Sequence, residues 1–172
     1  MVSATASMRV LYVLVAMEAG SRRILHTNVT AHPTAEWTIQ QLRECFTYGH
    51  PYRYLIHDRD SVFSAGLDSD WKGFGLRVWK TPIRAPKANA YCERLIGTIR
   101  REYLDRTLFW TTVDLEAKLT EFQHYYNGHR THAGLEGGLP EPDADGSPSP
   151  IDFRSYRWRR HCRGLYQTPI AA

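Results

Sequence analysis

Cysteine is scarce in this sequence of 172 residues, with three copies spread along the chain at Cys45, Cys92 and Cys162. No CxxC pair occurs, which excludes a zinc ribbon, and an odd number of distant cysteines argues against a disulfide scaffold. We therefore expect the chain to work in a reducing cytoplasm.

Long apolar runs are also missing. The stretch Val10–Met17 is apolar, but Glu18 and Arg22 follow closely. A membrane-spanning helix needs about 20 apolar residues, and no small-residue cleavage site of a signal peptide follows. The run predicts a strand buried on both faces, and we expect no membrane partner.

Lysine is rare beside arginine, with 4 Lys against 18 Arg in a chain of net charge +4. The net charge is +3 over residues 84–106, −5 over 107–150 and +4 over 151–172. Arginine keeps its charge and presents a planar fork that suits phosphate, so the pattern is compatible with a nucleic-acid partner. A GC-rich coding sequence explains the bias equally well. The hydrophobic fraction of 42% excludes disorder for most of the chain.

Periodicity predicts an α/β layout in the order β-β-α-β-α-β-α-α. The expected strands cover residues 9–17, 22–29, 54–57 and 76–80. The expected helices begin near Thr34, Ser64, Ala88 and Thr112, with Thr112 as the N-cap of the last. The stripe of the third helix is Cys92, Ile96, Ile99 and Tyr103, and that of the fourth is Leu115, Leu119, Phe122 and Tyr126. A linker over 134–150 and a basic tail with weak periodicity complete the chain.

Two acids stand out by their context. Asp58 follows directly on the short strand 54–57, where carboxylates of open α/β sheets face the ligand crevice. Glu93 lies one turn inside the helix that follows a proline-rich loop, off its apolar stripe. If strand and helix pack side by side, the two carboxylates can share a divalent cation. The alternatives are a turn-capping role for Asp58 and a solvated helix acid for Glu93.

Two other groups of residues are weaker candidates. His124, His129 and His132 cluster near a helix end, but no cysteine or acid stands at ligand spacing in the same turn, which favours structural histidines. Trp158 lies among arginines and can stack on a base, although a frayed basic tail is the preferred interpretation.

A longer part of the chain carries an ordered series of specific sequence motifs. It contains HDRDSVF at 57–63, TP at 81–82, RAPKANAYCER at 84–94, GT at 97–98, RRE at 100–102, YN at 126–127, then Arg130, His132 and Leu135. Glu93 falls 35 positions after Asp58. From about Leu11 to about Pro142 the chain resembles the integrase catalytic core of D-D-E transposases and retroviral-type integrases, above all bacterial insertion-sequence transposases. Thr131 departs from the pattern, which usually has proline there.

The resemblance implies an RNase H-like mixed sheet flanked by helices over residues 9–142, with 143–172 as linker and basic C-terminal tail. It implies metal-dependent phosphodiester transesterification on DNA, with Asp58 and Glu93 as catalytic metal ligands. The residues expected to contact DNA are Lys87, Asn89, Arg94, Arg100 and Arg101. The implied cofactor is a pair of Mg²⁺ or Mn²⁺ ions, and the implied partners are transposon ends, target DNA and further transposase copies in the bacterial cytoplasm.

One departure concerns the first catalytic Asp of the family, which lies on the first strand. Met1 to Arg9 contain neither Asp nor Glu, and Glu18 lies at the far end of the next strand. We therefore expect an N-terminally truncated core, without most of its first strand and without a helix-turn-helix, that is inactive alone. The alternatives are a non-catalytic DNA-binding or oligomerising transposase fragment and an RNase H-like nuclease acting on RNA.

Overall fold

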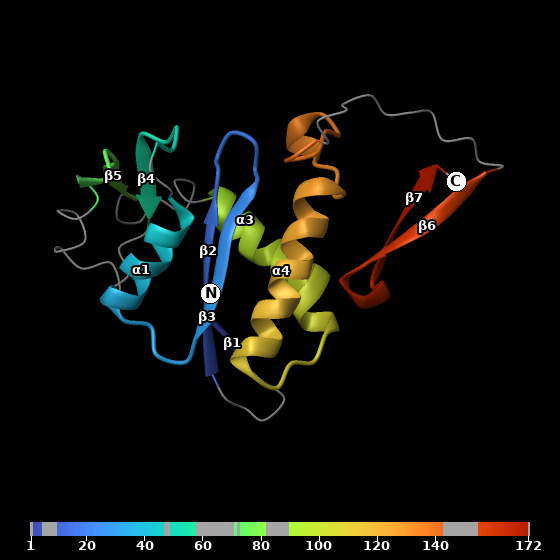
Figure 1. The fold of residues 1–172 in the computed structure, drawn as a ribbon, viewed down its shortest axis with the longest axis horizontal. Helices are drawn as coiled ribbons and strands as arrows, with labels where there is room; N and C mark the ends of the chain where they lie inside the picture. The colour runs from blue at the N-terminus through green and yellow to red at the C-terminus, as the bar shows by residue number, and fades with distance from the viewer. Residues whose placement is uncertain are drawn as a thin grey trace.

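An antiparallel sheet of three strands, β1 (Val2–Ala4), β2 (Val10–Met17) and β3 (Ile24–Thr30), divides the molecule (Figure 1). The computed structural model describes residues 2–4, 10–46, 49–57, 71, 73–81, 90–142 and 155–171. Val2 pairs with Tyr12, and Tyr12 pairs on its other side with Thr30, so β2 is the central strand. The predicted hairpin of residues 9–29 is confirmed, with its turn at residues 18–23.

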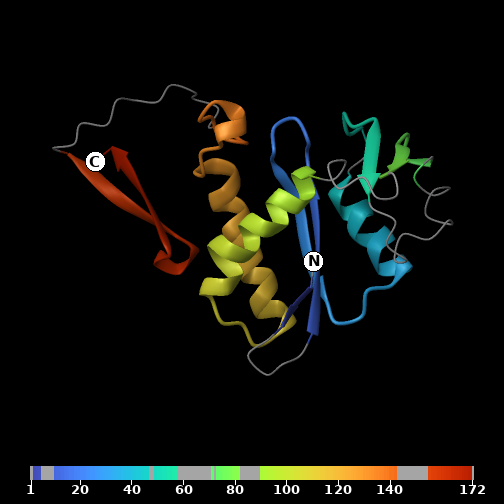
Figure 2. The same cartoon turned by 180° about the vertical axis from the view of Figure 1, so that it is seen from behind.

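Strand β2 is covered more completely on one face than on the other. Leu11 and Val13 are 3% exposed, and Val15 and Met17 join the same core cluster, while the alternate residue Tyr12 is 36% exposed. The prediction of burial on both faces is therefore wrong at Tyr12. Helices α3 and α4 cover the buried face, while α1 lies on the other side of the sheet (Figures 1 and 2).

A second, smaller core lies beside the first. It is built from α1 (Ala35–Cys45) and two parallel strands, β4 (Tyr54–His57) and β5 (Arg77–Lys80). Its buried side chains are Leu42, Phe46, Trp71 and Leu76. The Thr34 hydroxyl caps α1 by accepting from the Trp37 amide at 3.1 Å, and the strand predicted over 54–57 is confirmed. Most of the helix predicted from Ser64 lies outside the described residues.

The helix predicted from Ala88 to Arg106 is helical throughout its described residues, but it is not one regular α-helix. It consists of α3 (Ala90–Thr98), a π-helical segment η2 (Ile99–Tyr103) and a 3₁₀ turn η3 (Leu104–Arg106), while residues 88–89 lie outside the described part. Its buried stripe is also shifted, because Leu95, Ile99 and Tyr103 fill the core while Cys92 and Ile96 are half-buried. The Tyr103 ring stacks on Phe122 at 5.1 Å, and this packing selects the face that the helix turns inward.

Helix α4 (Thr112–Gly128) packs on the same face of the sheet as α3. The predicted stripe of Leu115, Leu119, Phe122 and Tyr126 is confirmed, since each is at most 4% exposed. The N-cap is Thr111 rather than Thr112, because the Thr111 hydroxyl accepts from the Asp114 amide. None of the described helices is long and apolar enough to cross a membrane.

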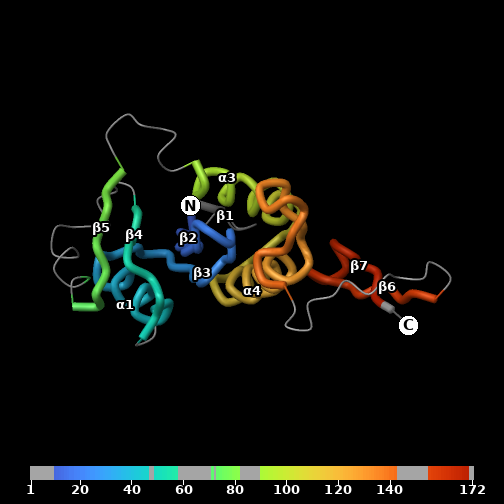
Figure 3. Tube along the Cα trace, turned by 90° about the horizontal axis from the view of Figure 1, so that it is seen from above, coloured from blue at the N-terminus to red at the C-terminus, as the bar shows by residue number. Residues whose placement is uncertain are grey.

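The residues expected to form a frayed tail instead form a hairpin. Strands β6 (Tyr156–His161) and β7 (Tyr166–Ala171) pair antiparallel across the short turn η5 (Cys162–Gly164). The hairpin extends from the far side of α4 (Figure 3). Cys162, Arg163 and Gly164 adopt φ +50°, +57° and +90°, so the turn depends on three consecutive left-handed residues.

Candidate active site and DNA interface

The two candidate catalytic acids differ in what surrounds them. Asp58, Lys87 and Asn89 lie outside the described residues. The strand that leads to Asp58 is described: β4 ends at His57, which is buried, pairs with Lys80, and accepts a backbone hydrogen bond from Thr81 at 3.0 Å. The approach of Asp58 to Glu93 therefore stays a prediction.

Glu93 lies in the first turn of α3 with an exposed side chain. Leu95 and Ile99 anchor α3 in the core, at 3% and 0% exposure, and thereby turn Glu93 outward. Among the described residues, nothing forms a hydrogen bond or ion pair with the Glu93 carboxylate. No group of three or more potential metal ligands occurs within the described ranges, which do not include Asp58.

The side chain of Arg101 lies along the helix in the direction of Glu93, with its guanidinium over Gly97. A Cβ atom built on Gly97 would lie 2.8 Å from Nη1 of Arg101, so the guanidinium rests against the bare backbone of Gly97. Gly97 is one turn beyond Glu93 on the same helix face, about 6 Å along the axis. We call the consecutive segments α3, η2 and η3 (residues 90–106) the helical arm. Arg94 and Arg100 are exposed on this arm. Three of the five residues expected to contact DNA, Arg94, Arg100 and Arg101, thus lie exposed on the same helical arm as Glu93.

The turn of the first hairpin reaches the beginning of α3. The guanidinium carbon of Arg22 lies 3.6 Å from the centre of the Tyr91 ring, a cation–π contact two residues before Glu93. Arg22 adopts φ +67° in this turn. Glu18 belongs to the same turn, where the Ser21 hydroxyl donates to its carboxylate. Sequence reasoning missed this contact, because nothing local in the sequence pairs position 22 with position 91.

The motif Tyr126-Asn127, Arg130 and His132 is structural in the described residues. The Asn127 side chain forms two hydrogen bonds of 2.9 Å to the backbone of Ile24, one to each of its peptide groups. His132 packs edge-on against Tyr126 at 4.6 Å. Burial and the nearby charge of Arg130 hold the pKa of His132 below its usual value, which keeps the ring neutral at pH 7. These residues fasten α4 to the sheet.

The histidines near the end of α4 differ in their surroundings. The ring centroids of His129 and of His161 in β6 lie 4.2 Å apart, and His124 is exposed on α4. The expectation of structural rather than metal-binding histidines stays a prediction. His161 was not among the sequence candidates, because its position next to α4 depends on how the hairpin packs.

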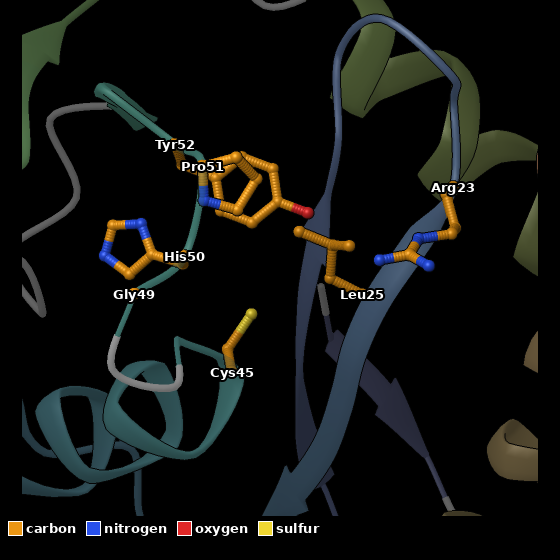
Figure 4. A pocket seen from close by; sticks show the side chains of 7 residues that line it. All are labelled: Arg23, Leu25, Cys45, Gly49, His50, Pro51 and Tyr52. Atoms are coloured by element: carbon orange, nitrogen blue, oxygen red, sulfur yellow. The ribbon is translucent and has the colours of Figure 1, made fainter.

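A small open pocket of about 320 Å³ lies between β3 and the loop after α1 (Figure 4). Its lining residues are Arg23, Leu25, Cys45, Gly49, His50, Pro51 and Tyr52. Burial raises the pKa of the Cys45 thiol to about 11, so the sulfur stays protonated and is a poor nucleophile at neutral pH. The described lining carries no carboxylate.

Comparison with known proteins gives one family match. Residues 75–140 match the family model described as integrase core domain. The match includes Glu93, Arg94, Arg100 and Arg101 and the motif from Tyr126 to His132. A search of curated proteins found no match to the sequence.

Solved structures share the fold. The catalytic core domain of BIV integrase is 18% identical, with a TM-score of 0.59 over 81% of this chain and 87% of that one. A chain of the simian T-cell lymphotropic virus intasome, solved with PP2A regulatory subunit B56 gamma, is 13% identical, with a TM-score of 0.66. This chain is covered over 98% of its length and spans 64% of the intasome chain. Residues 75–140 therefore resemble an integrase core domain, and the chain shares the fold of integrase catalytic cores.

Proposed function

We propose that this chain is the catalytic core of a bacterial insertion-sequence transposase that acts on phosphodiester bonds of DNA. The observation that carries the proposal is the exposed Glu93 carboxylate in the first turn of α3, 35 positions after Asp58, which follows directly on the short strand β4. The matched integrase segment and the shared fold support it. The proposed site of action is the bacterial cytoplasm, on nucleoid DNA.

In this proposal Asp58 and Glu93 would hold Mg²⁺ or Mn²⁺, and the bound ions would supply neutralisation of charge on the attacking and leaving oxygens of the phosphodiester. The guanidinium of Arg101 and its neighbours Arg94 and Arg100 bind phosphates of the DNA backbone beside the carboxylates. Lys87 and Asn89 complete this contact. The chain's own contribution is to hold the DNA strand and to present two carboxylates on elements that the core keeps rigid.

A third carboxylate completes the set in the family that the sequence resembles. The described strands β1 and β2 carry neither Asp nor Glu. We propose that residues 1–172 alone do not join DNA ends, and that a carboxylate opposite the end of β2 restores the reaction. In the antiparallel register Val2 faces Tyr12, so a residue placed before Met1 continues the ladder toward Leu14 and Val15. Glu18 is a second candidate, because the Arg22–Tyr91 contact brings its turn beside α3.

The test compares three proteins in a Mn²⁺-dependent DNA end-joining assay. One is the chain itself, one is a version extended upstream with an Asp-bearing strand, and one is the extended version with Glu93→Gln. We expect joining only by the extended protein. Glu36→Gln is the matched control, since Glu36 is also an exposed acid in the first turn of a helix. Joining by the unextended chain that Glu18→Gln abolishes would assign the third carboxylate to Glu18.

Metal binding gives an independent readout. Two carboxylates hold a hard cation weakly, so we expect weak Mg²⁺ or Mn²⁺ binding that depends on both Asp58 and Glu93. Calorimetric titration of Asp58→Asn and Glu93→Gln measures it. Equal affinity in the variants and the parent would place the metal elsewhere. The second candidate function, a non-catalytic DNA-binding or oligomerising fragment, predicts DNA binding that these substitutions leave unchanged and no joining by the extended protein.

A further inference from the structure

The C-terminal hairpin is strongly basic and carries exposed aromatic rings. Residues 155–171 contain four arginines and neither Asp nor Glu. Trp158 is 55% exposed and Tyr156 38% exposed, although large aromatic side chains normally dominate cores and interfaces. The hairpin extends away from the helices, as the views from the front and from above show (Figures 1 and 3).

The two faces of the hairpin differ. Side chains alternate along a strand, which puts Tyr156, Trp158 and Arg160 on one face of β6. The rings of Tyr156 and Trp158 meet edge to face at 5.2 Å and 90°, as expected for neighbours on one face. The opposite face carries Arg159 and His161, and the His161 ring lies 5.5 Å from Tyr125 of α4. One face therefore contacts the core, and the aromatic face is open.

The hairpin is held in place at its turn. Cys162 is 5% exposed within the main core, and the Tyr166 ring stacks on Tyr125 at 4.2 Å and 5°. The Tyr166 hydroxyl donates to the backbone carbonyl of Glu102, and Arg163 lies 3.4 Å from the Glu121 carboxylate. These contacts fix the open face relative to the helical arm that carries Arg100 and Arg101.

We propose that the face formed by Tyr156, Trp158 and Arg160 binds unpaired nucleotides of a DNA strand. An exposed indole offers a flat surface on which a base stacks, and the adjacent guanidinium binds the phosphate that follows it. The excess of positive charge requires an anionic partner. An acidic peptide would pair with the arginines but leave the indole without a ring to stack on, and duplex DNA keeps its base faces covered.

The inference rests on the proposed function, because an enzyme that cuts and joins DNA works at ends where strands separate. It adds a second contact surface on the far side of α4 from the sheet, whose binding needs no metal ion. A strand held there can extend along the helical arm past Arg100 and Arg101.

The experiment measures anisotropy of a labelled oligothymidine of about 12 nucleotides, a length within the site sizes of such surfaces, and of a duplex of equal length, both in EDTA. We expect the full chain to bind the single strand more tightly than the duplex. Trp158→Ala weakens binding of the single strand about tenfold, and Trp158→Phe retains most of it because a ring remains. Trp79→Ala is the control, since Trp79 is 61% exposed but belongs to β5 rather than to the hairpin.

The salt dependence of oligothymidine binding tests the role of Arg160. Arg160→Ala reduces the slope of log Kd against log salt by about 0.7, the contribution of one phosphate contact on a single strand. Arg163→Ala leaves the slope unchanged, because its guanidinium already pairs with Glu121. Circular dichroism of each variant checks that the fold is retained.

Unchanged oligothymidine binding in Trp158→Ala overturns the inference, as does equal or tighter binding of the duplex. Light scattering of Trp158→Ala gives a further check. If this variant lost dimers that the parent chain forms, while its oligothymidine binding was unaffected, the inference would be overturned and the face would be assigned to a second copy of the chain. Glu93→Gln in the extended version separates this inference from the proposed function, since it should abolish metal-dependent joining and leave oligothymidine binding in EDTA intact. Binding that depends on Trp158 in a protein whose extended version never joins DNA would overturn the proposed function alone.

Discussion

The guanidinium of Arg130 and the carboxylate of Glu102 are joined by two parallel hydrogen bonds, from Nε to Oε2 at 2.8 Å and from Nη2 to Oε1 at 2.6 Å. Arg130 lies just after α4, and Glu102 lies in the π-helical segment η2 directly after Arg100 and Arg101. The bonded carboxylate raises the pKa of Arg130, and each side chain is about a quarter to a third exposed. This pair connects the segment that carries the candidate DNA-binding arginines to the end of the longest helix.

Breaking this pair should destabilise the fold moderately. Arg130→Ala is expected to lower the free energy of unfolding by about 1–2 kcal/mol, since the pair is bidentate but partly solvated. Arg130→Lys should recover little, because an ammonium group cannot form the planar fork. Urea denaturation of the two single variants and the double variant with Glu102→Ala measures the coupling. Additive losses in that cycle would show that the pair contributes nothing of its own.

Asn127 should matter more for stability than its neighbour Gln123. Asn127→Ala leaves the buried N–H and one acceptor site of Ile24 without their partner, at a cost of about 2–4 kcal/mol. Gln123 also donates to the Ile24 carbonyl, at 3.1 Å, but Asn127 still satisfies that oxygen in Gln123→Ala. We therefore expect Gln123→Ala to cost less than about 1 kcal/mol. Thermal unfolding of both variants tests the order, and the reverse order would refute this role of Asn127.

Gly97→Ala should separate stability from DNA binding. The new methyl group pushes the Arg101 guanidinium off the backbone, while alanine raises helix propensity by about 1 kcal/mol over glycine. We expect unchanged or higher thermal stability together with weaker binding of duplex DNA. Gly128→Ala in α4 is the control, because no heavy atom lies within 4 Å of the added Cβ. Duplex binding that matches the parent would mean that Arg101 does not contact DNA from its position over Gly97.

The hairpin should loosen from α4 in mild acid. Burial, together with the nearby His129 and Arg159, holds the pKa of His161 below its ordinary value of 6.5. The unfolded chain therefore takes up a proton at higher pH than the folded one, and stability falls as the pH drops below about 6.5.

Hydrogen exchange of residues 156–171, corrected for intrinsic rates, measures this effect between about pH 7.5 and about pH 5.5. The amides of the hairpin should exchange relatively faster at the lower pH. His161→Phe should remove most of the dependence, while His124→Phe, an exposed position on α4, should not. A dependence that persists in His161→Phe would assign it to another group, such as His132.

Local patterns determined several parts of this fold. The four residues of the apolar stripe of α4 recur at helical spacing, and Tyr54–His57 is a short apolar run between turn signals, so each element could be predicted without knowing its neighbours. The motifs around Asp58, Glu93 and Tyr126 are also local patterns, and they were therefore enough to identify the resemblance to integrases. The sequence also placed Glu93 off the apolar stripe, where the structure leaves it exposed.

Tertiary structure decided what depends on contacts between distant positions. The π-helical turn at Ile99 follows from the packing of Tyr103 on Phe122, and periodicity within the helix carries no signal of that partner. The C-terminal hairpin lacks a buried stripe of its own, and its place is set by Cys162 and Tyr166 against α4 and Glu102. Sequence patterns report the period of a single element. The contacts named here stabilise the fold only when two elements meet, so the contacts could be seen only in the folded chain.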